Sequence, residues 1–284
     1  MAEQRDAVNL FANTPERAER GFLRRMPDFS RDGFDIDTGR MHQQSLRASF
    51  GVWAGDELRG LPNLDEGAEG DEDLQALKTV HTQSIETFAQ MADTLRQLGT
   101  DRSEGMDNHA RLRTAARVLE PKLARLRQTA EREIARAEAA IASEQGEIER
   151  ATRAADAGEA VTHGEIRAHW KAMPDSERTG HLLAPKLAQL DADTLRALAS
   201  APAYMTGLSE QQHAKVREEA ARRVAPAKLA RLQRLRAGRA LASTAVETLE
   251  RRAHRLVDFN RARQLAEAEA AARAKRAERY GVTE

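Results

Sequence analysis

The chain has 284 residues, and its 45 Lys and Arg residues balance its 45 Asp and Glu residues. It has no Cys, which excludes disulfides, thiolate catalysis and cysteine-type zinc sites. We find no apolar run of about 18 residues and no signal-peptide pattern at the start, so we expect no membrane span and a chain that is cytoplasmic when made.

Large apolar residues are scarce. Leu, Ile, Val and Phe together are 51 of the 284 residues, below the share of an ordinary globular protein. Ala, Leu, Arg, Glu and Gln are abundant, and these residues are strong helix formers. Helices with so little apolar surface depend on packing against other helices. The composition therefore predicts an all-α fold that is elongated and forms pairs or oligomers.

Charge is segregated along the sequence. Residues 1–73 contain 9 Arg and 16 Asp or Glu residues, whereas residues 214–279 contain 18 Arg or Lys and 8 Asp or Glu residues. The first segment also holds six of the eleven aromatic residues and many Gly, Pro and Asp residues. It predicts an irregular acidic arm with one short helix, capped by Thr14 and begun by Pro15.

The aromatic residues of the arm follow no helical or strand period. They either fold onto the helical body as a local core or act as anchors of an extended arm that docks into neighbouring subunits, where large aromatic side chains supply much of the binding energy. The irregular spacing favours the second interpretation. The candidate partner-binding residues are Phe22, Phe29, Phe34, Phe50 and Trp53.

Two long helices follow the arm. The first is expected over residues 74–98, with Asp73 as its cap and Gly99 at its end. The second is expected from Asp107 to about residue 157, and its apolar residues recur mostly at seven-residue steps, as in a coiled coil. Pro121 lies inside this run and is expected to kink the helix or to begin a new one.

Shorter elements are expected over residues 158–208. Gly158 to Gly164 is read as a joint, and Thr162 with Glu165 fits a capping box for the next helix. Further helices are expected from Pro174, near 176–188 and over 192–200, the last capped by Asp191 or Asp193. Residues 201–208 are expected to form a turn.

The last part of the chain is basic and helical. Ser209 and Gln212 fit a capping box, and Pro226 and Gly238 are expected to interrupt helices. Apolar positions from Val246 to Asn260 step by three and four residues, as a coiled-coil seam does. The basic patch comprises Arg222, Arg223, Lys228, Arg231, Arg234, Arg236 and Arg239.

These observations divide the chain into four segments. They are an acidic, aromatic arm (1–73), a helical hairpin or coiled coil (74–157), a short-helix connector (158–208) and a basic helical region (209–284). The expected fold class is all-α, with an elongated helical or coiled-coil body and an irregular N-terminal arm.

No sequence motif indicates catalysis. The chain has no phosphate loop, dinucleotide fingerprint, zinc-protease helix, calcium loop or nucleophile elbow. The nearest approach to a metal site is the group His163, Glu165 and His169. Glu165 and His169 are four residues apart and share a helix face. His163, however, stands at a predicted helix start, so the pair has no third ligand at a fixed spacing. We expect no metal, no cofactor and no enzymatic activity.

The basic patch has three interpretations. Its positive charge could neutralise the phosphates of a nucleic acid, although aromatic residues for base stacking are nearly absent there. It could instead bind an acidic protein partner or the acidic arm, or it could be a solvated helix face. The second interpretation is the favoured one.

One segment resembles known sequences. Residues 195–217 contain Ala-x-Ala-Pro-x-Tyr-x-x-Gly-Leu-Ser, and this stretch resembles uncharacterised helical proteins encoded among phage and prophage structural genes. The resemblance implies a virion or head-assembly setting and transfers no functional residue.

Together the sequence predicts a non-enzymatic phage virion or head-assembly protein, cytoplasmic when made and then located in the virion. Its expected partners are other protein subunits, most simply copies of itself in an oligomer, bound through the aromatic arm and the charged helices. The alternative is a helical nucleic-acid-binding protein that uses the basic patch.

Overall fold

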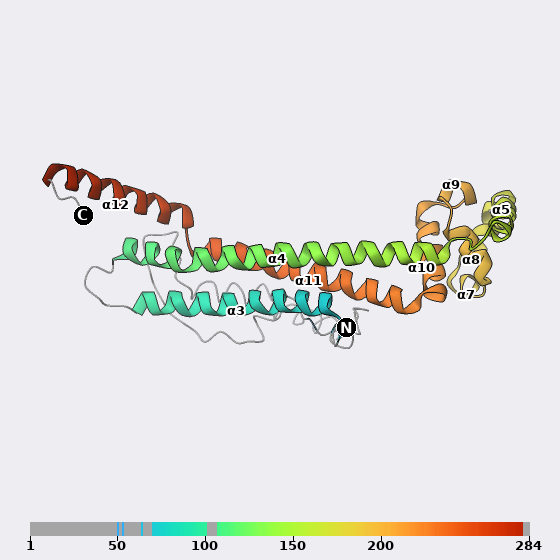
Figure 1. Ribbon diagram of the computed structural model, residues 1–284, viewed down its shortest axis with the longest axis horizontal. Coiled ribbons are helices and arrows are strands. Elements are labelled where there is room, and N and C mark those ends of the chain that lie inside the picture. The colour runs from blue at the N-terminus through green and yellow to red at the C-terminus, as the bar shows by residue number, and fades with distance from the viewer. Residues whose placement is uncertain (1–49, 51–52, 54–63, 65–69, 101–106, 281–284) are drawn as a thin grey trace, which may run out of the picture. The chain divides into compact units, whose positions relative to one another are not determined.

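The computed structural model describes residues 50, 53, 64, 70–100 and 107–280. Within these residues every regular element is a helix and there is no strand, so the predicted all-α class is confirmed (Figure 1). Phe22, Phe29, Phe34 and the short helix predicted at Pro15 lie outside the described residues. The helices are α3 (Glu72–Thr100), α4 (Asn108–Thr152), α5 (Ala157–Ala172), α6 (Asp175–His181), α7 (Ala184–Leu187), α8 (Ala192–Ala199), α9 (Ala203–Thr206), α10 (Glu210–Val224), α11 (Pro226–Leu256) and α12 (Phe259–Tyr280).

Contacts divide the chain into two compact units. The first comprises residues 1–136 and 238–284, and the second comprises residues 137–237. The helices α4 and α11 each supply residues to both units. The sequence-based division into four segments followed composition, whereas this division follows packing. The expected coiled-coil geometry stays a prediction.

The core of the first unit lies between α3, the first part of α4 and the last part of α11, which run side by side in Figure 1. Phe88 and Leu95 from α3 are fully buried, and Leu249 from α11 is 1% exposed. The beginning of α12 closes one end through Phe259 and Ala262. These apolar stripes recur at helical spacing, which is why the sequence revealed α3 and α4.

Some residues of the predicted seam at the end of α11 are buried. Leu249, Ala253 and Leu256 are buried in the core of the first unit. Val246 is half-buried, and Asn260 is exposed because α11 has already ended at Leu256.

Phe50 and Trp53 are packed against helices of their own chain. Phe50 is fully buried, with its ring centroid 5.7 Å from that of Phe88. The Arg252 guanidinium lies over both rings, 5.2 and 5.0 Å from their centroids. Trp53 is 7% exposed and lies 5.6 Å from the ring of His81. For these two residues the structure shows the local-core arrangement, so they are not exposed anchors.

Gly238 does not interrupt a helix, contrary to the sequence-based expectation. It lies inside α11, where a Cβ atom would meet the Trp53 ring at 3.2 Å and the Leu77 side chain at 3.3 Å. The glycine therefore permits close approach of an aromatic ring from a distant part of the sequence. Its cost in helix propensity is offset by this packing.

Several predicted helix starts are confirmed. The Asp107 carboxylate accepts a hydrogen bond of 2.6 Å from the Ala110 N–H at the start of α4. Ser209 and Gln212 form the complete capping box of α10, and Asp191 caps α8. These are local signals, because cap and first turn are adjacent in sequence.

Two predicted starts are wrong. The cap of α3 is Asp71 rather than Asp73, and its carboxylate accepts from the N–H groups two and three residues later, at 3.2 and 3.3 Å. Thr162 is in the interior of α5, which begins earlier with Asp156 as its cap. Consequently Gly158 and the residues up to position 164 belong to a helix and not to a joint. Asp156 satisfies the first-turn N–H groups, so no later cap is needed.

The prolines act differently in the two long helices. Pro121 lies in the interior of α4, which continues through it as one helix. Pro121 has no N–H group to donate to the Arg117 carbonyl. Both residues are exposed, so water can bind this carbonyl instead. Pro226 is the first residue of α11, where a missing N–H has no consequence.

The second unit is built mainly from short helices. Its larger core cluster gathers Trp170 from α5, Leu195 and Leu198 from α8 and Val216 from α10. The expected helix near 176–188 is split into α6 and α7, and the expected turn at 201–208 contains α9. Gly207 ends α9 with a φ of 69°, a left-handed conformation that favours glycine.

The packing around Gly238 yields a stability prediction. We expect Gly238→Leu to lower the free energy of unfolding by about 1–3 kcal/mol, because the added side chain overpacks the Trp53 contact. Urea unfolding followed by circular dichroism measures this. The control is Gly146→Ala in α4, where a Cβ atom meets nothing within 4 Å and where we expect a gain of about 0.5–1 kcal/mol. Wild-type stability of Gly238→Leu would contradict the role of this glycine.

Candidate functional site

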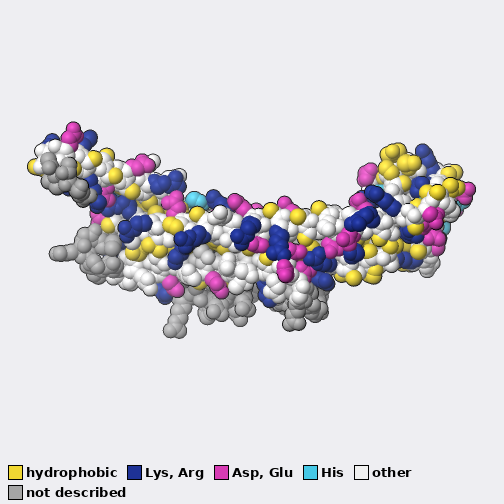
Figure 2. All heavy atoms as spheres, in the orientation of Figure 1, with side chains coloured by type: hydrophobic (Ala, Val, Ile, Leu, Met, Phe, Trp, Pro, Cys, Tyr) yellow, Lys and Arg dark blue, Asp and Glu magenta, His cyan; other side chains and the backbone are white. Residues whose placement is uncertain are grey.

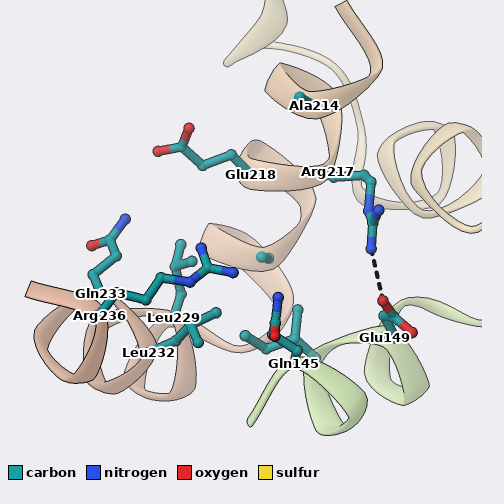
Figure 3. A pocket seen from close by; sticks show the side chains of 11 residues that line it. Gln145, Glu149, Ala214, Arg217, Glu218, Leu229, Leu232, Gln233 and Arg236 are labelled. Atoms are coloured by element: carbon teal, nitrogen blue, oxygen red, sulfur yellow. Dashed lines mark hydrogen bonds and ion pairs between the residues drawn. The ribbon is translucent and has the colours of Figure 1, made fainter. Parts of the chain in front are cut away.

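A pocket of about 430 Å³ lies in the second unit, between the last part of α4, α10 and the beginning of α11 (Figure 3). Its floor is apolar. Ile148, Ala221 and Leu232 form a buried cluster there, and Leu229 packs against it from α11. The three helices meet here because each turns a short apolar stripe toward the same point.

The rim of the pocket is polar and charged. Arg217 and Glu149, each about half exposed, form an ion pair of 2.8 Å that is drawn in Figure 3. Glu218 pairs at 3.2 Å with Arg222. Arg236 also lines the pocket, and it forms no ion pair among the described residues. Further lining residues are Gln145, Ala214 and Gln233.

Ion pairs join α11 to α4 beside the pocket. Arg231 reaches Glu144 at 2.6 Å, and Glu144 is only 12% exposed. Lys228 pairs with Glu147. The hydrogen bond and charge of Lys228 lower the pKa of Glu147, and the same contact raises the pKa of Lys228. Both groups therefore remain ionised over a wide pH range.

The basic patch is in large part neutralised by the chain itself. Besides Lys228 and Arg231, Arg222 pairs with Glu219 at 2.5 Å, and Arg223 donates to the Leu190 carbonyl at 2.5 Å. Arg239 also has an interaction within the chain. On the face drawn in Figure 2, Lys and Arg side chains are interspersed with Asp and Glu side chains.

Two members of the patch differ from the rest. The Arg234 Nε is buried without a hydrogen-bond partner, and Arg236 extends toward the pocket. Sequence reasoning found the arginines but missed their partners Glu144 and Glu147. These acidic residues lie more than 80 positions earlier, and no local pattern pairs them with α11.

The residues weighed as metal ligands do not converge. His163 is 1% exposed, whereas Glu165 and His169 are exposed on other faces of α5. Within the described residues there is no group of three His, Cys, Asp or Glu side chains that could hold a metal ion.

His163 is instead a buried imidazole. Neither ring nitrogen has a hydrogen-bond partner, and Glu159 lies 3.6 Å from its Nε2. Burial lowers the pKa of His163, and the charges of Arg196 and Arg167 act in the same direction. Glu159 and, more weakly, Asp193 oppose them. The net effect favours the neutral ring.

The chain matches no protein-family model, no curated protein and no solved structure.

The described part of the chain includes no helix with the length and hydropathy needed to cross a bilayer.

The ion pairs of α4 allow a matched comparison. We expect Glu144→Gln to lower the free energy of unfolding by about 1–3 kcal/mol, because it removes the negative charge from a partly buried ion pair with Arg231. Glu149→Gln, which breaks the half-exposed pair with Arg217, is expected to change it by less than about 1 kcal/mol. Urea denaturation of both variants tests this, and equal effects would show that burial of the pair does not matter.

His163 predicts a pH dependence of stability. Its pKa in the folded chain lies below the ordinary value of 6.5. Since the unfolded chain then binds the proton more readily, stability is full above pH 6.5 and falls as the pH decreases below it. We expect His163→Gln to lose less stability than the wild type between pH 7.5 and pH 5.5, measured by urea denaturation. The control is His109→Gln at the exposed start of α4, which should retain the wild-type dependence. An unchanged pH profile of His163→Gln would contradict the assignment.

Proposed function

We propose that this chain is a non-enzymatic assembly protein that binds neighbouring subunits, most simply copies of itself. The observation that carries the proposal is the exposure of α12. Every residue from Ala270 to Tyr280 is exposed, although the start of the same helix is buried in the first unit through Phe259 and Ala262.

An exposed helical end of this length is marginal by itself. Three turns of helix without tertiary contacts gain little stability in water, and most helical stability comes from packing. Tyr280 is 70% exposed, and tyrosine is a residue type that often anchors protein interfaces. A partner that covers this end would supply the missing packing.

The shifted ionisable groups support a structural role. Asp107 and Asp191 have lowered pKa values and cap helices. The other shifted groups belong to interhelical ion pairs or to the buried imidazole described above. Each shift thus has a role in folding, without recourse to a reaction.

The narrower proposal concerns the setting. The resemblance of residues 195–217 to proteins encoded among phage structural genes supports a virion or its assembly as the place where the subunits meet. In that setting the aromatic residues Phe22, Phe29 and Phe34 would bind neighbouring subunits together with α12.

Size-exclusion chromatography with light scattering tests the role of α12. We expect the full chain to be an oligomer, and a chain ending at Glu269 to have a lower mass because the exposed turns are removed. Circular dichroism should show both chains folded. A chain lacking only residues 281–284 is the control and should keep the full mass. An unchanged mass after removal of residues 270–284 would refute the role of α12.

A second candidate function is nucleic-acid binding, and the composition of α12 favours it. Residues 273–279 carry four cations and one carboxylate, all exposed. The original basic patch supports it less, since its own acidic partners already neutralise much of it. If α12 binds phosphates, the logarithm of the affinity should fall linearly with the logarithm of the salt concentration.

Fluorescence anisotropy with a labelled duplex DNA tests this second function. A triple substitution of Arg273, Arg276 and Arg279 by Gln should then reduce both the affinity and the salt slope. A matched control removes three cations of the paired set, Arg222, Arg223 and Lys228. Undetectable binding to DNA at low salt would dismiss the nucleic-acid function.

A further inference from the structure

The pocket on the second unit is built to receive an apolar group. Ile148, Leu229 and Leu232 give it an aliphatic floor, and its volume of about 430 Å³ falls in the range of binding pockets. Ile148 and Leu232 are themselves largely buried, so the gain comes from covering the apolar surface that water still reaches, to which the half-buried Leu229 contributes.

The charges of the rim indicate that a group bound there should be negatively charged. Both acidic lining residues have an arginine partner in the chain, Glu149 with Arg217 and Glu218 with Arg222. Arg236 is the lining charge that has no ion pair among the described residues. In Figure 3 its side chain extends toward the space between α10 and α4. A carboxylate beside an apolar group would satisfy this rim.

One segment of the chain has this chemistry. Residues 26–38 contain four Asp residues and one Arg, and they lie outside the described part of the structure. Within the segment Phe34 is followed directly by Asp35, with Asp37 two positions later. An aromatic ring next to a carboxylate matches an aliphatic floor next to Arg236.

We propose that the pocket binds residues 26–38 of a second copy of this chain. The Phe34 ring lies on the floor formed by Ile148 and Leu232, and the Asp35 carboxylate pairs with Arg236. The inference rests on the proposed assembly function and identifies the receptor for the aromatic arm. Each copy would present one arm and one pocket, so two different parts of the chain meet in the contact.

Photo-crosslinking of the full chain tests the contact. The variant Phe34→benzoylphenylalanine is prepared with natural isotopes and mixed with ¹⁵N-labelled chain that carries the natural Phe34. After irradiation, mass spectrometry locates the crosslinks. We expect the dominant crosslinks to join the two isotopic forms and to fall on pocket-lining residues, namely Ile148, Ala214, Leu229 and Leu232. Crosslinks confined to one copy, or spread over the surface, would overturn the proposal.

Matched variants of the labelled chain test the charge of the rim and the apolar pocket separately. Arg236→Glu reverses the rim charge, and Ala214→Trp fills the mouth of the pocket from an exposed position. Each should reduce the crosslink yield at least about fivefold, whereas Lys215→Glu and Ala227→Trp, at exposed positions outside the lining, should change it less than twofold. Equal losses in the variants and their controls would also overturn the proposal. Circular dichroism confirms that all four are folded.

Light scattering on the same samples separates this inference from the proposed function. An oligomer that depends on α12 but gives no pocket crosslink would leave the assembly function standing and remove the pocket as the receptor of the arm. A full chain that is monomeric at all concentrations would remove both. A synthetic peptide of residues 26–38 should reduce the crosslink yield, and the same peptide with Asp35 and Asp37 changed to Asn should do so less.

Discussion

The first unit depends on two aromatic rings that precede α3 in the sequence and pack into its helical core. Phe50 and Trp53 occupy the space that α3 and α11 leave between them, and Gly238 gives the indole room. The helices alone carry narrow apolar stripes, because large apolar residues are scarce throughout the chain. Two rings of this size add roughly 150–250 Å² of buried surface each, a substantial part of such a small core. Phe50 and Trp53 of the acidic segment are thus components of the fold.

In the second unit, ion pairs help to hold α4 against α11, whereas in the first unit apolar packing holds the helices together. Arg231 and Lys228 of α11 meet Glu144 and Glu147 of α4, and the low exposure of Glu144 makes its pair more than a surface contact. Pairs of this kind specify the alignment of helices even where their net energy is modest. The basic patch therefore carries less unbalanced positive charge in the folded unit than its sequence alone indicates. Among the described residues, Arg236 and the end of α12 remain exposed outside these pairs.

The sequence could predict those features of the fold that depend on residues close together in the chain. Apolar periodicity identified α3 and α4, and the caps at Asp107, Asp191 and Ser209 needed only the next few residues. The expectations for Gly238 and Thr162 were wrong because each was judged by its neighbours in sequence. A tryptophan from far along the chain explains the glycine, and an earlier cap made the threonine unnecessary. The pocket was not foreseen either, since its floor joins residues from three helices.

The division of α11 between the two units has a consequence for biosynthesis. The first unit is made from both ends of the chain, and the second unit from one continuous stretch between them. On the ribosome, residues 137–237 can therefore fold as soon as they emerge, whereas α3 and the first half of α4 must wait for the rest of α11. During that interval the leucines of α3 face water without their final partners. Exposed apolar surface of this kind makes partly folded chains prone to aggregation in general.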